Sequence, residues 1–150
     1  MKTWGSVEEV LDFAISGEEE AVKFYTRLAE QASNAAMRRA FEDFAREETG
    51  HKKKLLAVKA GKTLQSASKT VKDMKIADYV VDIEPSPGMD YQDALLLAMK
   101  KEKAAFKLYT DLAAATENQE VKTALLGLAQ EEAKHKLRFE IEYDDSLVEN

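Results

Sequence analysis

The chain carries two copies of a four-residue motif, Glu48-Thr49-Gly50-His51 and Glu132-Ala133-Lys134-His135, which hold its only two histidines. Residues three apart lie on one face of a helix, so the glutamate and the histidine of each copy can reach the same metal ion. A carboxylate and an imidazole form an oxygen and nitrogen ligand set that suits iron or manganese, and also zinc. The motif therefore predicts helices that together carry a metal site.

A further glutamate precedes each motif at a constant distance. Glu18 lies 30 positions before Glu48, and Glu102 lies 30 positions before Glu132. Both are flanked by apolar residues at helical steps, which places them on a buried helix face. Because burying an unpaired carboxylate is costly, we expect cations to compensate these groups, rather than a charged outer face on an ordinary bundle. The predicted metal ligands are Glu18, Glu48, His51, Glu102, Glu132 and His135.

Both motifs belong to an internal repeat. A shift of 84 positions, without a gap, superposes Ala21/Ala105, Tyr25/Tyr109, Leu28/Leu112, Ala45/Ala129 and Glu47/Glu131 as well as the predicted ligands. Duplicated helical hairpins would meet around a pseudo-twofold axis, which brings equivalent residues together. Di-iron and di-manganese carboxylate bundles have the same arrangement of ligands. Two of their helices provide one glutamate each, and the other two provide a Glu-x-x-His motif each.

Apolar periodicity and helix signals predict an all-α fold made of one domain, residues 1–150. Helices are expected at about 7–32, 35–60, 91–116 and 119–143. Ser6 and Asp90 are their predicted N-caps, and a connector at 61–90 holds both prolines and a short helix within 71–83. Two short turns and one long connection predict two antiparallel hairpins joined by a crossover, which resembles the ferritin-like four-helix bundle.

Composition excludes several classes of protein. The net charge of −6 gives no electrostatic footprint for nucleic acid or for an anionic membrane. The absence of cysteine excludes disulfides, thiolate metal sites and cysteine catalysis in this chain. With no apolar segment of membrane-spanning length and no signal-like start, we expect a cytoplasmic protein.

Over roughly residues 7–143, the chain resembles the rubrerythrin-type ferritin-like domain. The resemblance lies in the pattern Glu18-x-x-Ala21-x-x-x-Tyr25 followed by Glu48-x-x-His51, and in its repeat from Glu102 to His135. The resemblance implies two iron ions, with manganese or zinc as alternatives. It also implies that Glu48 and Glu132 bridge the metals, that His51 and His135 are terminal ligands, and that Tyr25 and Tyr109 donate hydrogen bonds to carboxylates. From the residues alone, core packing explains the tyrosines equally well, and Glu47 and Glu131 are expected on a solvated face.

The sequence departs from the peroxidase-type rubrerythrins at two points. Those proteins have an extra glutamate one turn after the third-helix ligand, where this chain has Ala105, so the resemblance does not extend to their redox-linked iron movement or to their efficient peroxidase turnover. They also carry a cysteine-bound rubredoxin centre. Since this chain has no cysteine, its electrons are expected from an external donor such as a rubredoxin-like protein.

Three functions follow from this interpretation. The first is an oxidoreductase, a peroxidase or ferroxidase, that reacts ferrous iron with peroxide or dioxygen. The alternatives are a non-catalytic protein that binds or handles iron or another metal, and a structural bundle that the metal staples together. The connector could also contact a second subunit, which would give a homodimer.

Overall fold

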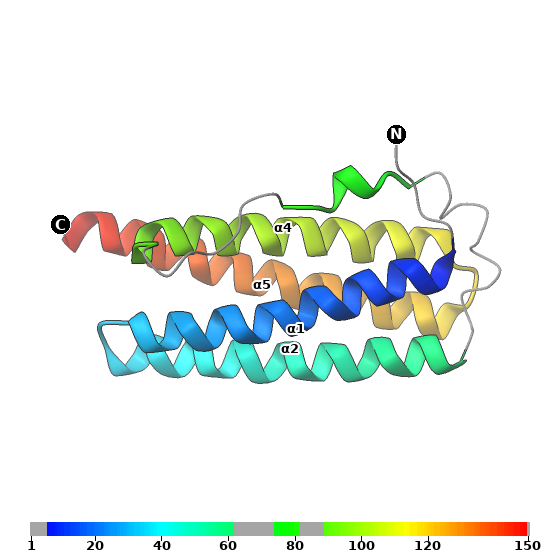
Figure 1. Cartoon of the computed structure of the whole chain (residues 1–150), viewed down its shortest axis with the longest axis horizontal. Coiled ribbons are helices and arrows are strands. Elements are labelled where there is room, and N and C mark those ends of the chain that lie inside the picture. The colour runs from blue at the N-terminus through cyan, green and yellow to red at the C-terminus, as the bar shows by residue number, and fades with distance from the viewer. Residues whose placement is uncertain (1–5, 62–73, 82–88, 150) are drawn as a thin grey trace.

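The computed structural model describes residues 6–61, 74–81 and 89–149, and these form a bundle of four long α-helices (Figure 1). The helices are α1 (Val7–Gln31), α2 (Ala35–Gly61), α4 (Tyr91–Ala115) and α5 (Gln119–Glu149), and a 3₁₀ turn, η2 (Ile76–Asp78), lies in the connector. The predicted all-α four-helix bundle is confirmed. None of the described helices is long and apolar enough to span a membrane.

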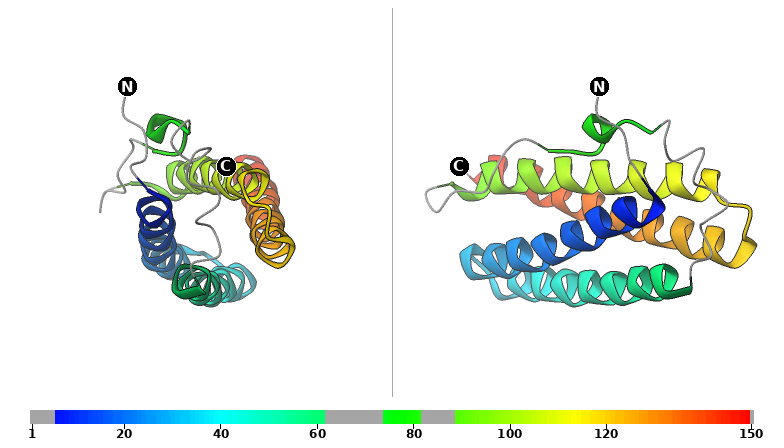
Figure 2. Two further views of the ribbon diagram at one scale, coloured as in Figure 1. Left: turned by 90° about the vertical axis from the view of Figure 1, so that its right-hand side faces the viewer. Right: turned by 45° about the vertical axis from the view of Figure 1, so that its right-hand side comes forward.

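The chain forms two antiparallel hairpins, α1–α2 and α4–α5, which pack side by side (Figures 1 and 2). Helix α2 ends and α4 begins at opposite ends of the bundle, so the connection between them must return along its length. The described part of the connector, residues 74–81, runs along the outside of α4 (Figure 1). This is the predicted crossover.

Each long helix begins at a side chain that accepts a hydrogen bond from a backbone N–H of its first turn. The acceptors are Ser6, Asn34, Asp90 and Asn118, and the donor lies three residues further on in every case. Such caps satisfy backbone groups that the helix itself leaves without partners. Because Ser6 and Asp90, like Asn34 and Asn118, are 84 positions apart, the repeat extends to the helix starts.

Two helical boundaries differ from the sequence prediction. Helix α5 continues beyond the predicted end at 143 to Glu149. In these additional turns the Ser146 carbonyl accepts a hydrogen bond from the Gln92 amide at 3.4 Å, which ties them to the start of α4. Within the described part of the predicted connector helix, only η2 is helical; residues 71–73 and 82–83 lie outside the described residues.

Two apolar clusters fill the bundle, one toward each end. One combines the first half of α1 with the second half of α4 and the first half of α5, and includes Leu11, Leu55 and Leu125. The other includes Leu28, Phe41 and Phe139. The six predicted ligands lie between the two clusters along all four helices. The apolar core therefore encloses a polar layer at the middle of the bundle.

Candidate metal centre

The structure brings all six predicted ligands together in that middle layer. Each of these residues is at most 4% exposed. Helices α1 and α4 each contribute one glutamate, and α2 and α5 each contribute a glutamate and a histidine one turn apart. The contributing residues are Glu18, Glu48, His51, Glu102, Glu132 and His135.

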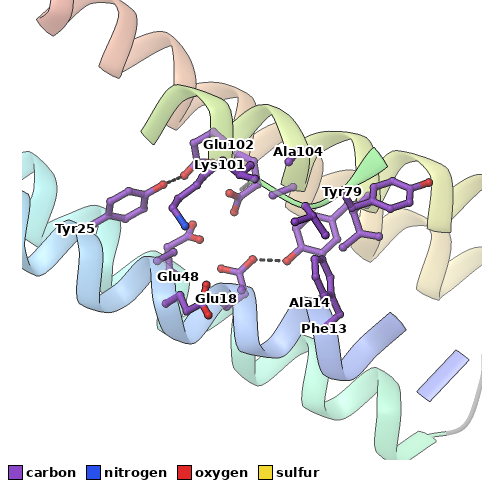
Figure 3. Close-up of a pocket in the computed structure, with 18 residues that line it drawn as sticks. Phe13, Ala14, Glu18, Tyr25, Glu48, Tyr79, Lys101, Glu102 and Ala104 are labelled. Carbon is purple, nitrogen blue, oxygen red and sulfur yellow. Dashed lines mark hydrogen bonds between the residues drawn. The ribbon is translucent and has the colours of Figure 1, made fainter. Parts of the chain in front are cut away.

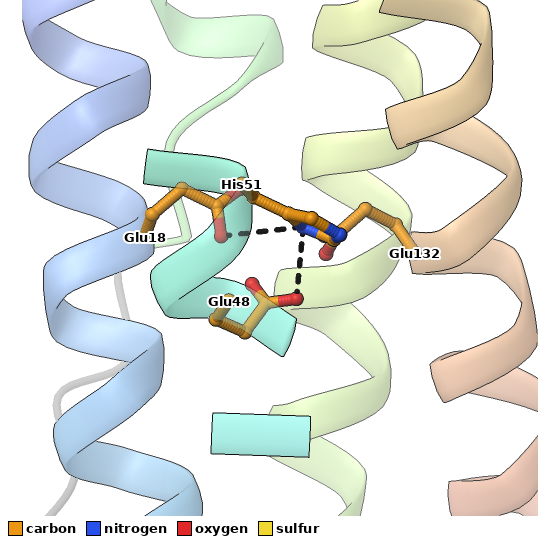
Figure 4. Close-up of side chains that lie close together, drawn as sticks. All are labelled: Glu18, Glu48, His51 and Glu132. Carbon is orange, nitrogen blue, oxygen red and sulfur yellow. Dashed lines mark ion pairs between the residues drawn. The ribbon is translucent and has the colours of Figure 1, made fainter. Parts of the chain in front are cut away.

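The six residues form two overlapping groups whose candidate ligand atoms lie within 4.8 Å of one another. One group joins Glu18 and His51 to Glu48 and Glu132, and the other joins Glu102 and His135 to the same two glutamates. In the first group, shown in Figure 4, His51 Nδ1 lies 2.7 Å from Glu132 Oε1 and 3.2 Å from Glu48 Oε1. Glu48 and Glu132 therefore stand where a residue shared by two metal positions would stand.

Every one of the six residues leaves a buried side-chain atom without a hydrogen-bond partner. These atoms are Glu18 Oε2, Glu48 Oε1, His51 Nδ1, Glu102 Oε2, Glu132 Oε1 and His135 Nδ1. The two Nδ1 atoms lie near carboxylate oxygens without hydrogen-bonding geometry. Orphaned buried polar atoms are costly in a folded protein. Converging carboxylate and imidazole donors suit iron, manganese or zinc, and four carboxylates can offset two divalent charges, so these residues fit a two-metal centre.

Burial changes the proton affinity of the carboxyl groups. It raises the pKa of Glu18 and of Glu102 from 4.5 to about 8, and it raises the pKa of Glu132 well above its usual range. For His51, burial alone lowers the pKa, but contacts with Glu132 and the other carboxylates outweigh it and raise the pKa to about 12. The metal-free centre therefore holds protons near neutral pH, and a metal ion would displace them.

Two buried tyrosines connect the hairpins through the ligand carboxylates. Tyr25 on α1 donates a hydrogen bond to Glu102 Oε1 on α4, and Tyr109 on α4 donates one to Glu18 Oε1 on α1 (Figure 3). Each hydroxyl occupies one oxygen of a carboxylate whose other oxygen has no partner. The tyrosines thus orient Glu18 and Glu102 toward the centre, which is more than core packing.

Glu47 contacts the centre from the outside. Its carboxylate Oε2 lies 2.6 Å from His135 Nε2, although the Glu47 side chain is 47% exposed. The sequence interpretation placed Glu47 and Glu131 on a solvated face and missed this contact, and Glu131 also lies in the group around His135. The available signal was the repetition of an acidic residue directly before each motif. Among the described residues, His51 has no comparable partner at Nε2.

A pocket of about 270 Å³ lies between α1 and α4 and reaches the centre (Figure 3). All four glutamates of the centre line it, and so does Ala105. Position 105, where the resemblance drawn from the sequence placed a missing glutamate, therefore lies in the wall of the pocket that the carboxylates also line. The opposite face, between α2 and α5, is covered at His135 by Glu47 and by the Phe44 ring, whose centroid is 4.2 Å from that of His135.

Comparisons with known proteins agree with this geometry. A crystal structure of a Thermotoga maritima protein, provisionally described as a ferritin-like diiron-carboxylate protein, has the same fold with a TM-score of 0.79. The two sequences are 21% identical, and the match covers 97% of this chain and 99% of that one. No curated protein sequence matches this chain. The model of the rubrerythrin family, however, matches residues 9–143. The chain therefore belongs to the rubrerythrin family, as its two hairpins and their ligands indicated.

Proposed function

We propose that this protein is a di-iron oxidoreductase that reacts ferrous iron with peroxide or dioxygen. The observation that carries the proposal is the pair of overlapping four-residue groups, in which six buried donor atoms have no partner. Family membership supports iron among the metals that such donors accept.

In this proposal Glu18 and His51 would hold one iron, and Glu102 and His135 would hold the other. Glu48 and Glu132, which belong to both groups, would bind both ions. When bound, two ferrous ions supply two electrons, enough with two protons to reduce one hydrogen peroxide to two waters.

The surrounding residues keep this ligand set in place. The hydroxyls of Tyr25 and Tyr109 hold one oxygen each of Glu102 and Glu18, and Glu47 holds the ring of His135. Partners of this kind fix ligand orientation and typically change metal affinity by about 10- to 100-fold. The apolar clusters close the layer off toward the two ends of the bundle.

Access and reduction require two further features. The pocket between α1 and α4 gives a small oxidant a route to the carboxylates. The chain has no cysteine with which to build a thiolate electron-transfer centre, so we assign the return of electrons to a separate donor, such as a rubredoxin-like protein.

Anaerobic loading with two equivalents of ferrous iron, followed by one equivalent of peroxide, tests the proposal. We expect rapid oxidation of both irons in the native chain. Glu48→Ala removes a residue of both groups and should reduce the rate to that of free iron in buffer. Glu42→Ala, on the exposed face of the same helix, is the matched control and should behave like the native chain.

Oxidation at the buffer rate by native protein that holds two irons would refute the oxidoreductase. If chelation of that protein also lowered its melting temperature strongly, the metal-stapled structural bundle would replace it. If chelation left the melting temperature nearly unchanged, the result would instead favour a protein that binds or carries iron.

A further inference from the structure

The pocket beside the centre is larger than the proposed oxidants require. Its volume is about 270 Å³, whereas one water molecule occupies roughly 30 Å³ of liquid, and peroxide or dioxygen is only slightly larger. A cavity of this size approaches the lower end of the range found for sites that bind small organic molecules, roughly 300–1,000 Å³. The volume therefore calls for an occupant with more atoms than the oxidant.

Small side chains on the facing helices create this space. Ala14, Gly17 and Ala21 on α1 face Ala104 and Ala105 on α4 across the pocket. Gly17 is exposed and lies at the open side of the pocket, and a Cβ atom added there would meet nothing within 4 Å.

The inner end of the same pocket is formed by carboxylates of the proposed two-metal centre. Glu18 Oε2 and Glu102 Oε2 are buried without a hydrogen-bond partner, and both residues line the pocket (Figure 3). An occupant would thus lie directly beside the proposed metal positions, with its body between the alanines.

The outer wall of the pocket is held in place by the connector. Tyr79, Val80 and Val81 line the pocket from outside the bundle. The Tyr79 hydroxyl donates to Asp111 Oδ2 at 2.7 Å, Lys107 Nζ donates to the same oxygen at 2.9 Å, and this ammonium lies 5.4 Å from the Tyr79 ring centroid. These contacts anchor the wall on α4, so the pocket exists before anything binds.

Besides the four glutamates of the centre, the pocket is lined by apolar residues and by two further charged residues. Phe13, Val81 and Leu108 offer apolar contact, while Lys101 and Glu20 carry opposite charges. Lys101 is half-buried, and its side chain extends toward Glu48 in Figure 3, whereas Glu20 is exposed. The Lys101 ammonium also lies 5.9 Å from the Phe24 ring centroid. Once metal ions offset the four carboxylates of the centre, the half-buried charge of Lys101 favours a negative group beside it, because the exposed Glu20 is screened by solvent.

We propose that this pocket binds a small organic acid, with its apolar body between α1 and α4 and its carboxylate near Lys101. The inference rests on the proposed function, because four carboxylates without metal ions would repel an anion. It gives the two-metal centre an organic ligand in addition to its oxidant. The size of the cavity fits a chain of about six carbons better than a long-chain lipid.

Calorimetric titration of zinc-loaded protein with hexanoate, hexanol and hexylamine tests the proposal without any redox chemistry. We expect hexanoate to bind with a Kd of about 1 mM, and hexylamine to bind at least about tenfold more weakly. Ala105→Phe should abolish binding of all three probes by filling the pocket. Ala114→Phe adds the same bulk at an exposed position of α4 and should leave binding unchanged.

Lys101→Met separates charge recognition from volume. This variant should bind hexanoate and hexanol within about twofold of each other, because the ammonium is lost while the apolar walls remain. Zinc content is measured for every variant, so that a loss of hexanoate binding with two zinc ions retained is assigned to the pocket. Equal affinity for hexanoate and hexylamine in the native chain, or unchanged binding in Ala105→Phe, would overturn the proposal.

The outcomes also separate this inference from the proposed function. Native protein that holds two zinc ions but binds no hexanoate at about 10 mM would refute the organic ligand and leave the oxidoreductase standing. Native protein that holds no zinc would refute the two-metal centre, and the organic ligand would fail with it.

Discussion

The two hairpins carry the same candidate metal ligands but surround them differently. Glu18, Glu48 and His51 recur 84 positions later, and all six residues reach the same layer. The glutamates that precede the motifs do not behave alike: Glu47 contacts His135, whereas Glu131 lies on the His135 side and not beside His51. Duplication therefore explains where the ligands stand, while the contacts around them make the two proposed metal positions inequivalent.

The two long faces of the centre differ as well. Between α1 and α4, small side chains leave a pocket that reaches the carboxylates. Between α2 and α5, the Phe44 ring and Glu47 cover His135. A small molecule thus has a route to one face, while on the other face the His135 ring is held in position.

The largest effect is expected from residues that belong to both groups. Glu48→Ala and Glu132→Ala should each lose both metal ions, whereas Glu18→Ala and Glu102→Ala should each lose about one, because only the first pair is shared. A site saturated about 1,000-fold above its Kd stabilises the fold by about 4 kcal/mol, or roughly 8–16 °C for a chain of this size. Elemental analysis after dialysis and the melting temperature measure both quantities.

Equal metal loss in all four variants would contradict the division into two groups. A different result for Glu48→Ala and Glu132→Ala would show that the inequivalence of the hairpins extends to the shared ligands. Glu42→Ala, outside the centre on α2, should retain both ions and serves as the control.

The second effect is a pH dependence of stability. Stability should fall with rising pH in the metal-free protein, whereas the contribution of the metal should grow with pH in the metal-loaded protein. Glu18 and Glu102 have pKa values of about 8 in the fold against 4.5 ordinarily, so between these pH values the folded chain binds protons that the unfolded chain has lost. Stability then falls as pH rises. His51, whose pKa is raised from 6.5 to about 12, adds a loss in the same direction above pH 6.5.

Calorimetric scans from pH 5 to pH 8 measure this effect. The melting temperature of the metal-free protein should fall, while metal binding strengthens because the metal requires deprotonated ligands. The difference in melting temperature between the metal-loaded and the metal-free protein should therefore increase by about 10 °C from pH 5 to pH 8. In the metal-free protein, Glu102→Gln should reduce the fall of the melting temperature with pH. A melting temperature that rose over this range would refute the raised pKa values of Glu18 and Glu102.

Helical periodicity and the repeat were sufficient to predict the bundle, its hairpins and the residues that meet at its centre. Buried glutamates on an apolar stripe have few explanations, and that made Glu18 and Glu102 recognisable. The contact of Glu47 with His135 joins two hairpins, and no spacing within one helix reveals it. The same holds for Tyr25 and Tyr109, whose partners lie on the opposite hairpin, and for the pocket, which depends on how far α1 and α4 stand apart.

A smaller effect should separate the two outer glutamates. Glu47→Gln weakens the contact with His135 and should reduce the affinity of one metal by about 10- to 100-fold. Glu131→Gln, its equivalent in the repeat, should change the affinity by less than about threefold, because Glu131 lies near His135 but makes no hydrogen bond to it. Competition with a chromophoric chelator measures both constants, and similar losses in the two variants would show that Glu131 holds His135 as strongly as Glu47 does.

The smallest effect is expected where the hairpins are most alike, at the equivalent caps Asn34 and Asn118. Each side chain accepts one backbone hydrogen bond, from Met37 N at 2.8 Å and from Val121 N at 3.1 Å. Replacement by alanine should cost about 1 kcal/mol in each case, which lowers the melting temperature by roughly 2–4 °C. Neither cap touches the centre, so metal content should stay unchanged. Urea unfolding of the metal-loaded variants checks the pair, and a difference of more than about 1 kcal/mol between them would show that the asymmetry of the centre reaches the turns of the bundle.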